Sequence, residues 1–310
     1  MKTEKKAATA AKGRSPAPTP AAGVAAITGA TLLWGGTFVV IRDSVHELDP
    51  RALVFARFLV AALIFTAVAL LRRRPLERAT LAWGAVSGFF SGGAFLLQAI
   101  GLTEISAGSS AFLTCAGSLF TGLIAWPLLR QRPSGALLAG IAIALAGAAL
   151  LTLDRGLHLG NGELITLVGA LGFAVAVVAV GRLGSDFDPL AVAAAQAWVT
   201  ALMLVPAAPR ALEQLSALPA AGWARFAYLA IAGSVLATIL MLWSQRVLPP
   251  GRVGLLLALE PVFALVFAAT VGGEQFAARW WFGAALILSA ALLVEWPSLR
   301  GRPATPSATG

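Results

Sequence analysis

The chain has 310 residues, of which 58% are hydrophobic and 12% are charged, and its mean hydropathy is +0.83. This composition excludes an ordinary soluble globular domain and indicates a protein whose solvent is lipid. The formal net charge is +9, but the basic residues lie in short loops and a tail and form no continuous stripe, so nucleic acid is not an expected partner.

Composition also argues against metal and disulfide chemistry. The one cysteine, Cys115, can form no intrachain disulfide and no cysteine-based zinc site. The two histidines, His46 and His158, fall in connecting loops without a partner at metal-ligand spacing. We therefore expect neither a metal nor another cofactor.

Residues 1–23 combine Lys, Ala and Pro without apolar periodicity, which is typical of a disordered basic tail. A cleaved signal peptide is the competing interpretation. It fits poorly, because its n-region would be long and proline-rich and the apolar run that follows, 24–41, exceeds a usual signal core. Residues 298–310 form a second predicted tail.

Between the tails, long apolar runs alternate with short polar breaks, and each run reaches the roughly 20 residues that a bilayer core requires. The ten runs cover approximately residues 24–42, 51–71, 80–101, 107–129, 135–153, 162–181, 189–208, 222–245, 251–273 and 280–297. In hydrocarbon the backbone must satisfy its own hydrogen bonds, and the runs lack the two-residue alternation of a barrel. The predicted fold class is an all-α membrane protein with ten transmembrane helices.

The distribution of basic residues predicts the orientation. Sixteen Lys and Arg fall on the side of the N-terminal tail and five on the other side. Because basic loops stay in the cytoplasm, we expect both termini to be cytoplasmic in a multi-pass protein of the inner (plasma) membrane. Most tryptophans lie near the predicted membrane faces, whereas Trp34, Trp198 and Trp243 lie deeper.

The ten runs divide into two similar halves. Residues 48–65 align with residues 187–204, pairing Asp49-Pro50 with Asp188-Pro189, and a second alignment pairs Gly108 with Gly251. Five runs therefore repeat as five runs, in segments 24–155 and 160–297. Because five is odd, the second copy must enter the membrane from the opposite face, which gives the inverted repeat of secondary transporters.

The run at 251–273, GRVGLLLALEPVFALVFAATVGG, places Glu260 and Pro261 near the middle of a predicted span. An ionised side chain at that depth costs on the order of 3 kcal/mol on insertion scales, so a chain that keeps one there usually needs it. Glu260 is predicted to carry a proton or to bind a substrate amine; a structural hydrogen bond to a neighbouring helix is the alternative. Pro261 is the predicted kink, and it frees a backbone carbonyl one turn earlier.

Three motifs in this order, LLWGGTFVVIR, DPRALVFARFLVAAL and LEPVFALVFAATVGGE, resemble the EamA-type members of the drug/metabolite transporter superfamily. The resemblance covers about residues 24–297 and implies a ten-helix carrier of two five-helix repeats that exports amino acids or other small metabolites. It also implies that Glu260 and Pro261 form the Glu-Pro of the ninth helix, that Glu274 is the acid at its end, and that Arg57 is the arginine of the second helix.

The first half departs from this pattern. Gly117, Ser118 and Gln131 stand opposite Glu260, Pro261 and Glu274. Any carboxylate chemistry at the midplane therefore belongs to the second half.

Arg57 and two amides are the other polar candidates. Arg57 cannot be deprotonated and is predicted either to clamp a substrate carboxylate or, as the favoured alternative, to snorkel outward or pair with Asp43 or Asp49. Gln98 and Gln196 suit a zwitterion, although hydrogen bonds between helices are the commoner use of such residues.

The first span offers Trp34 and Thr37 on either side of two glycines, which predicts a pocket wall or an ordinary packing seam. Trp243, another deep tryptophan, completes the candidate site. Gly84, Gly88 and Gly92 recur every four residues and predict a packing face or a sliding surface.

These observations favour a secondary active transporter that exports a small amino-acid-like or cationic metabolite by alternating access, with proton coupling through Glu260. Its expected partners are the substrate, protons and the lipid bilayer. The alternatives are a non-transporting scaffold or receptor and a membrane-embedded enzyme. No nucleotide-binding or hydrolase motif is present, and only Glu260 is a deep acid, so the chain is not expected to be an enzyme. Substrate identity and oligomeric state stay open.

Overall fold

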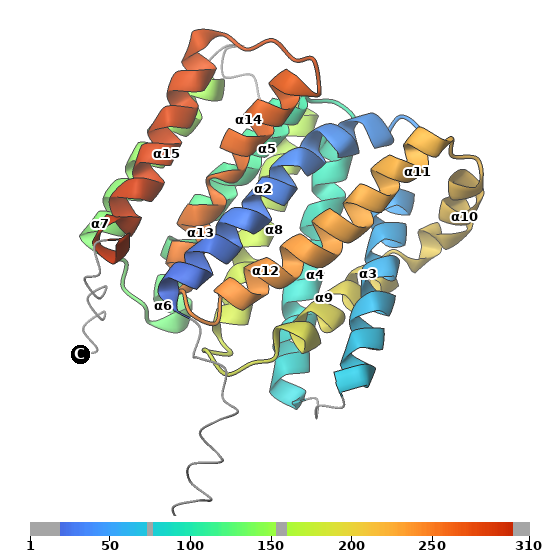
Figure 1. Cartoon of the computed structure of the whole chain (residues 1–310), viewed down its shortest axis with the longest axis horizontal. Coiled ribbons are helices and arrows are strands. Elements are labelled where there is room, and N and C mark those ends of the chain that lie inside the picture. Colours follow the sequence, from blue (N-terminus) through green and yellow to red (C-terminus); the bar gives the residue numbers. More distant parts are fainter. Residues whose placement is uncertain (1–18, 73–76, 153–159, 300–310) are drawn as a thin grey trace, which may run out of the picture.

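The structure is a computed structural model that describes residues 19–72, 77–152 and 160–299; all regular structure in these ranges is helical (Figure 1). The predicted tails lie largely outside these residues. The helices are α2 Pro20–Ser44, α3 Pro50–Arg72, α4 Arg78–Gly101, α5 Ala107–Leu119, α6 Thr121–Leu129, α7 Gly135–Thr152, α8 Asn161–Gly181, α9 Pro189–Met203, η2 Val205–Ala207, α10 Ala208–Ser216, α11 Ala220–Ala227, η3 Tyr228–Leu236, α12 Ala237–Ser244, α13 Pro250–Leu257, α14 Glu260–Thr270 and α15 Ala278–Leu299.

Local sequence explains where several helices begin. Thr19 accepts a hydrogen bond from the Ala22 N–H at 3.2 Å, and Pro20 occupies the first position of α2, so this helix starts four residues before the apolar run. Asp188 caps α9 in the same way, accepting from Leu190 N–H at 3.1 Å. Both starts combine a polar cap with a proline where no N–H is needed.

Six helical stretches in the described residues are long and apolar enough to cross a membrane: Pro20–Ser44, Pro50–Arg72, Arg78–Gly101, Asn161–Gly181, Ala220–Ser244 and Pro250–Thr270. A seventh is possible if α9 and the following η2 and α10, bent by 60°, form one span. The chain is therefore a multi-pass, helical membrane protein.

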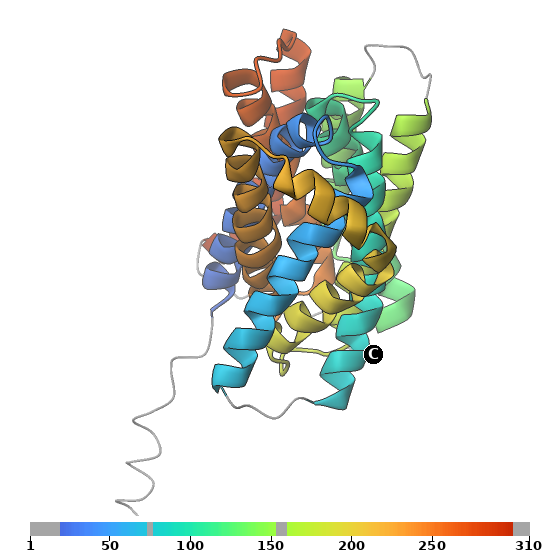
Figure 2. The same ribbon diagram turned by 90° about the vertical axis from the view of Figure 1, so that its right-hand side faces the viewer.

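The helices pack as a bundle in which distant parts of the sequence lie side by side (Figures 1 and 2). α4 packs against α8 and α9, α3 against α9, and α2 against α12 and α14. α7 and α15 pair with each other at one edge (Figure 1). This arrangement brings α2, α4, α5, α8, α9 and α12–α14 around one interior region.

The glycine stripe of α4 is a packing face, as one of its two interpretations predicted. A Cβ added at Gly84 would lie 2.9 Å from Ala195 Cβ, one at Gly88 would lie 2.6 Å from Gln196 Cα, and one at Gly92 would lie 2.6 Å from Thr200 Oγ1. The missing side chains thus let the backbones of α4 and α9 approach closely.

Two helices that were predicted to be single spans are interrupted. α13 ends at Leu257 and α14 begins at Glu260, with short-range bonds from Ala258 N to Leu255 O and from Leu259 N to Leu256 O between them. Pro261 contributes no N–H to the first turn of α14, so the predicted kink is an interruption just before the proline. α5 and α6 are likewise separated at Phe120.

Candidate functional site

A small interior cavity of about 60 Å³ lies at the interruption between α13 and α14. At about 30 Å³ per liquid water, it holds roughly two waters. Its lining comes from both halves of the chain: Trp34, Thr37, Phe58, Ser91, Phe95, Gln98, Thr114, Phe173, Ala176, Val177, Gln196, Thr238, Met241, Leu257 and Glu260. The structure therefore brings together five residues proposed from the sequence, Trp34, Thr37, Gln98, Gln196 and Glu260.

Glu260 is the first residue of α14 and is 8% exposed. In the first turn of α14, Pro261 has no N–H, and the N–H groups of Val262 and Phe263 bond to the Leu259 carbonyl at 3.0 and 3.3 Å. No described residue donates a hydrogen bond to the Glu260 carboxylate or pairs with it as a cation. Pro261 is buried next to it but does not line the cavity. The carboxylate is thus available to a proton or to a ligand.

Arg57 lies fully inside the protein, with 1% exposure. Its guanidinium carbon lies 5.1 Å from the ring centroid of Phe58 and 4.8 Å from that of Phe95, and both rings line the cavity. Within the described residues, Nε and Nη2 have no hydrogen-bond partner. Cation–π contact with two rings offsets only part of the cost of burying this charge.

The favoured alternative for Arg57 is wrong, because the side chain neither snorkels outward nor pairs with a loop acid. Asp43 pairs with Arg42 at 2.9 Å. Asp49 accepts from the Arg51 N–H at 2.9 Å at the start of α3. Both acids are held near the end of the helix bundle, whereas Arg57 points into its interior.

The two amides connect helices and also face the cavity. Gln98 Nε2 donates to Thr114 Oγ1 at 3.2 Å, joining α4 to α5. Gln196 Nε2 donates to Ser87 Oγ at 2.7 Å, joining α9 to α4, and Ser87 Oγ donates to the Ala176 carbonyl at 2.9 Å. The predicted hydrogen bonds between helices are confirmed. Both amides also line the cavity, where a ligand would meet them.

Both interpretations of the first span apply at different residues. Trp34 and Thr37 line the cavity, and Trp34 Nε1 donates to the Gly233 carbonyl at 2.8 Å within the π-helical segment η3. A Cβ at Gly35 would lie 2.6 Å from Phe263 Cβ, so this glycine serves the seam between α2 and α14. π-helical turns are rare and occur frequently at functional sites.

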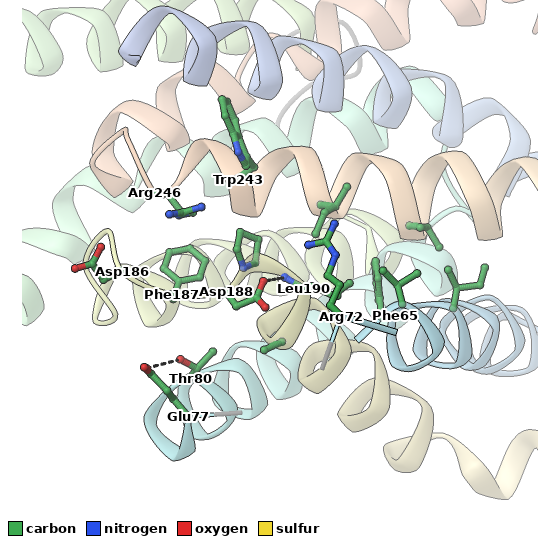
Figure 3. A pocket seen from close by; sticks show the side chains of 16 residues that line it. Phe65, Arg72, Glu77, Thr80, Asp186, Phe187, Asp188, Leu190, Trp243 and Arg246 are labelled. Carbon is green, nitrogen blue, oxygen red and sulfur yellow. Dashed lines mark hydrogen bonds between the residues drawn. The ribbon is translucent and has the colours of Figure 1, made fainter. Parts of the chain in front are cut away.

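Trp243 does not belong to this cavity. It lies on a separate groove between α3 and α12 (Figure 3). Trp243 is four residues beyond Ile239 on the groove side of its helix, whereas Thr238 and Met241 face the cavity. Because residues four apart share one helix face, Trp243 lies on the groove face of its helix and not on the cavity face. The depth of Trp243 in its predicted span does not reveal this difference.

Sequence reasoning missed the phenylalanines of the lining. Phe58, Phe95 and Phe173 line the cavity in contact with one another: the Phe58 and Phe95 rings are tilted with centroids 4.9 Å apart, and the Phe95 and Phe173 rings meet edge to face at 4.7 Å. Each lies in a long apolar run, where a phenylalanine looks like core. The one usable signal was that Phe58 follows Arg57 directly.

An ion pair closes the end of the bundle where α2 finishes. Arg42 pairs with Glu274 and donates to it, and it also pairs with Asp43. This contact joins α2 to the connection between α14 and α15, so the acid that follows the ninth predicted span links the two halves of the chain.

The family comparison agrees with this architecture. The model of the EamA-like transporter family matches residues 21–153 and again 160–296. A solved crystal structure has a TM-score of 0.71 with this chain at 19% identity, covering 89% of this chain and 98% of the other, which shows a shared fold.

Several curated relatives are similar to this chain, among them the following three. The uncharacterized inner membrane transporter YedA of Escherichia coli K12 is 28% identical over 85% of this chain and 87% of its own. A probable terminal-alkyne amino-acid exporter of Streptantibioticus cattleyicolor is 27% identical over 78% of this chain and 82% of its own. A probable amino-acid metabolite efflux pump of Escherichia coli K12 is 28% identical over 56% and 58%. Because the family match covers most of its length in two copies, the chain belongs to the EamA-like transporter family.

Proposed function

We infer that the chain is a secondary active transporter that exports a small, amino-acid-like zwitterion across the inner (plasma) membrane. The observation that carries this proposal is the pair of opposite charges at one aromatic cavity, Glu260 on its wall and Arg57 behind Phe58 and Phe95. Neither charge has an ionic partner among the described residues. A ligand with an amine and a carboxylate would supply both partners at once.

The wall suits an apolar or aromatic side chain on that zwitterion. Trp34, Phe95 and Phe173 offer ring surfaces, while Gln98 and Gln196 place amides beside them. A purely cationic substrate would satisfy Glu260 and leave Arg57 buried without an anion, so we favour the zwitterion. The names of two relatives, an amino-acid metabolite efflux pump and an amino-acid exporter, support the same substrate class.

We also propose that the chain has ten transmembrane helices, arranged as two inverted repeats at residues 24–155 and 160–297. In this scheme the interrupted stretches α5–α6 and α13–α14 are corresponding spans, and both termini are cytoplasmic. The packing pattern supports it, because exchanging the halves maps the contact of α4 with α8 onto that of α12 with α2, and the contacts of the α5–α6 stretch with α8 onto those of the α13–α14 stretch with α2. Discontinuous helices at the midplane are typical of such carriers.

A cavity of about 60 Å³ is too small for an amino acid, so helices must separate to admit one. Two contacts join the halves at different places: the glycine seam of α4 with α9, and the ion pair Arg42–Glu274. We propose alternating access in which these contacts open in turn, with Glu260 exchanging a proton for the substrate amine.

Efflux from proteoliposomes tests the proposal. Wild-type protein is expected to release loaded apolar amino acids faster when a pH gradient is imposed, and Glu260→Gln is expected to remove that dependence. Glu213→Gln, which changes an exposed acid on α10, is the matched control and should behave like wild type. Gradient-independent efflux in the wild type would refute proton coupling. No efflux of any amino acid would favour a scaffold, a receptor or an embedded enzyme.

A further inference from the structure

Residues that line the proposed substrate cavity occupy matching positions of the two halves. Two spacings align the halves, one that sets residues 48–65 on residues 187–204 and one that sets Gly108 on Gly251. Extended along the chain, these spacings pair Trp34 with Phe173, Thr37 with Ala176, Phe95 with Thr238 and Gln98 with Met241. Each member of these pairs lines the cavity. A feature at one mouth of the cavity therefore has a definable counterpart at the other mouth.

One mouth lies at the end of the seam between α2 and α14 (Figure 1). Thr37 lines the cavity, and Arg42 lies five residues further along α2, which is about 7.5 Å of helix. Between these positions the seam is close, because a Cβ added at Gly272 would lie 3.3 Å from Val39 Cγ1. At its end Arg42 Nη1 donates to Glu274 Oε1 and joins the first half of the chain to the second. In the proposed topology this mouth faces outward.

The ion pair at this mouth is partly shielded and is supported by further contacts. The side chains of Arg42 and Glu274 are 23% and 16% exposed. Arg42 Nε also donates to Asp43 Oδ1 at 3.0 Å, and Nη2 donates to the Gly272 carbonyl at 3.5 Å. Reduced contact with water strengthens the attraction between the two charges and limits its screening by salt. An interaction between the halves thus fastens the outer mouth.

The counterpart of this pair at the other mouth carries no charge. The same spacings place Gly181 opposite Arg42 and Gln131 opposite Glu274. The ends of α8 and α6 meet there, because a Cβ added at Gly181 would lie 2.9 Å from Leu129 Cδ1. A glycine and a glutamine can form no ion pair, so this mouth lacks the fastening of the first.

The charged residues next to these two positions do not replace the missing pair. Arg130 and Arg132 flank Gln131, and Arg182 follows Gly181. The guanidinium carbon of Arg182 lies 5.6 Å from the ring centroid of Trp83. Basic side chains repel one another and supply no partner of opposite sign. The two mouths are therefore electrostatically unequal.

We propose that Arg42 and Glu274 form the outer gate of the carrier, and that the absence of their counterpart at the inner mouth keeps the resting protein closed to the outside and free to open first to the cytoplasm. A difference of one ion pair between the two closed mouths biases which of them opens. The cavity then loads from the cytoplasm, which is the order that an exporter needs. The inference rests on the proposed function for the existence of two mouths and for their orientation, and it adds which mouth is held and by which side chains.

The accessibility of one cavity residue from each side of the membrane tests the gate. Thr37→Cys, introduced together with Cys115→Ala, is labelled with a membrane-impermeant maleimide in right-side-out and in inside-out vesicles. Without substrate, labelling is expected to be faster from the cytoplasmic side than from the outside. Glu274→Gln, which removes the ion pair, should raise the rate from the outside about fivefold, the effect of one partly exposed ion pair.

Two further variants separate a gate from a merely structural contact. Arg42→Glu combined with Glu274→Arg exchanges the charges and should return the outside rate to the wild-type value. Glu104→Gln removes an exposed acid beyond the end of α4, at the same end of the bundle in the proposed topology, and should leave the rate unchanged. Size-exclusion profiles establish that each variant is folded.

Three results would each overturn the gate: an unchanged outside rate in Glu274→Gln, no restoration by the charge exchange, or faster labelling of the wild type from the outside. Labelling needs no transported substrate. A lack of amino-acid efflux from proteoliposomes would therefore refute the substrate proposal without altering these rates, so the two failures are distinguishable.

Discussion

Replacing Arg57 with methionine separates a structural from a functional role for this residue. Methionine fills a similar elongated space without a charge or a donor. If the arginine is kept for a ligand, its removal should make the ligand-free protein more stable and eliminate transport. If it is a structural anchor, the same change should destabilise the protein.

The magnitude follows from the environment of the guanidinium. Nε and Nη2 have no hydrogen-bond partner in the described residues, and each unsatisfied buried donor costs about 1–3 kcal/mol. The contacts with the rings of Phe58 and Phe95 return about 0.5–2 kcal/mol each. Low end against low end and high end against high end, the difference predicts that Arg57→Met raises the free energy of unfolding by about 1–2 kcal/mol.

The assay combines thermal unfolding in detergent with efflux from proteoliposomes. Arg57→Met should unfold at a higher temperature than wild type, show no efflux, and gain no further stability from an amino acid that stabilises the wild type. Gln196→Met is the control in the same cavity wall. It loses the bond to Ser87 and should be destabilised by about 0.6–1 kcal/mol. A lower unfolding temperature for Arg57→Met, or normal efflux, would refute the reasoning.

Two further changes test the packing around the cavity. Gly88→Ala places a Cβ 2.6 Å from the Gln196 backbone and should lower the unfolding free energy by about 1–3 kcal/mol. Gly93→Ala is the control: its added Cβ has nothing within 4 Å, so it should be neutral or slightly stabilising. Equal unfolding temperatures for the two variants would contradict a tight seam. Trp34→Phe removes the donor to the Gly233 carbonyl and should lower the free energy of unfolding by about 1–2 kcal/mol. The same thermal unfolding assay measures it, and an unchanged unfolding temperature would count against a bond that positions η3.

Several features of the site could be predicted because they depend on local sequence. A carboxylate at the centre of an apolar run must either bind something or be paired, which made Glu260 a candidate. Proline cannot donate in a helix, which predicted a kink at Pro261. Glycines four residues apart predicted the seam of α4. None of these inferences required knowledge of a neighbouring helix.

Other features depended on which helix lies opposite. Whether Arg57 reaches a loop acid, solvent or the interior depends on the rotation of α3 within the bundle, and the structure turns it toward Phe95 on α4. Gly117, which stands opposite Glu260 in the other half, has the Ala170 backbone 2.4 Å from an added Cβ. No carboxylate fits there without displacing α8, a constraint that the repeat alignment alone does not contain.

The sequence by itself determined the solvent, the helical class, the family resemblance and the position of one deep acid, because hydrophobicity, backbone hydrogen bonding and proline geometry act within a single segment. Only the tertiary structure decided that five candidates share one cavity, that phenylalanines complete its wall, and that Trp243 faces a different groove. The physical reason is that a side chain's neighbours depend on how each helix is rotated and packed, and in lipid that rotation is decided by close contacts between helices.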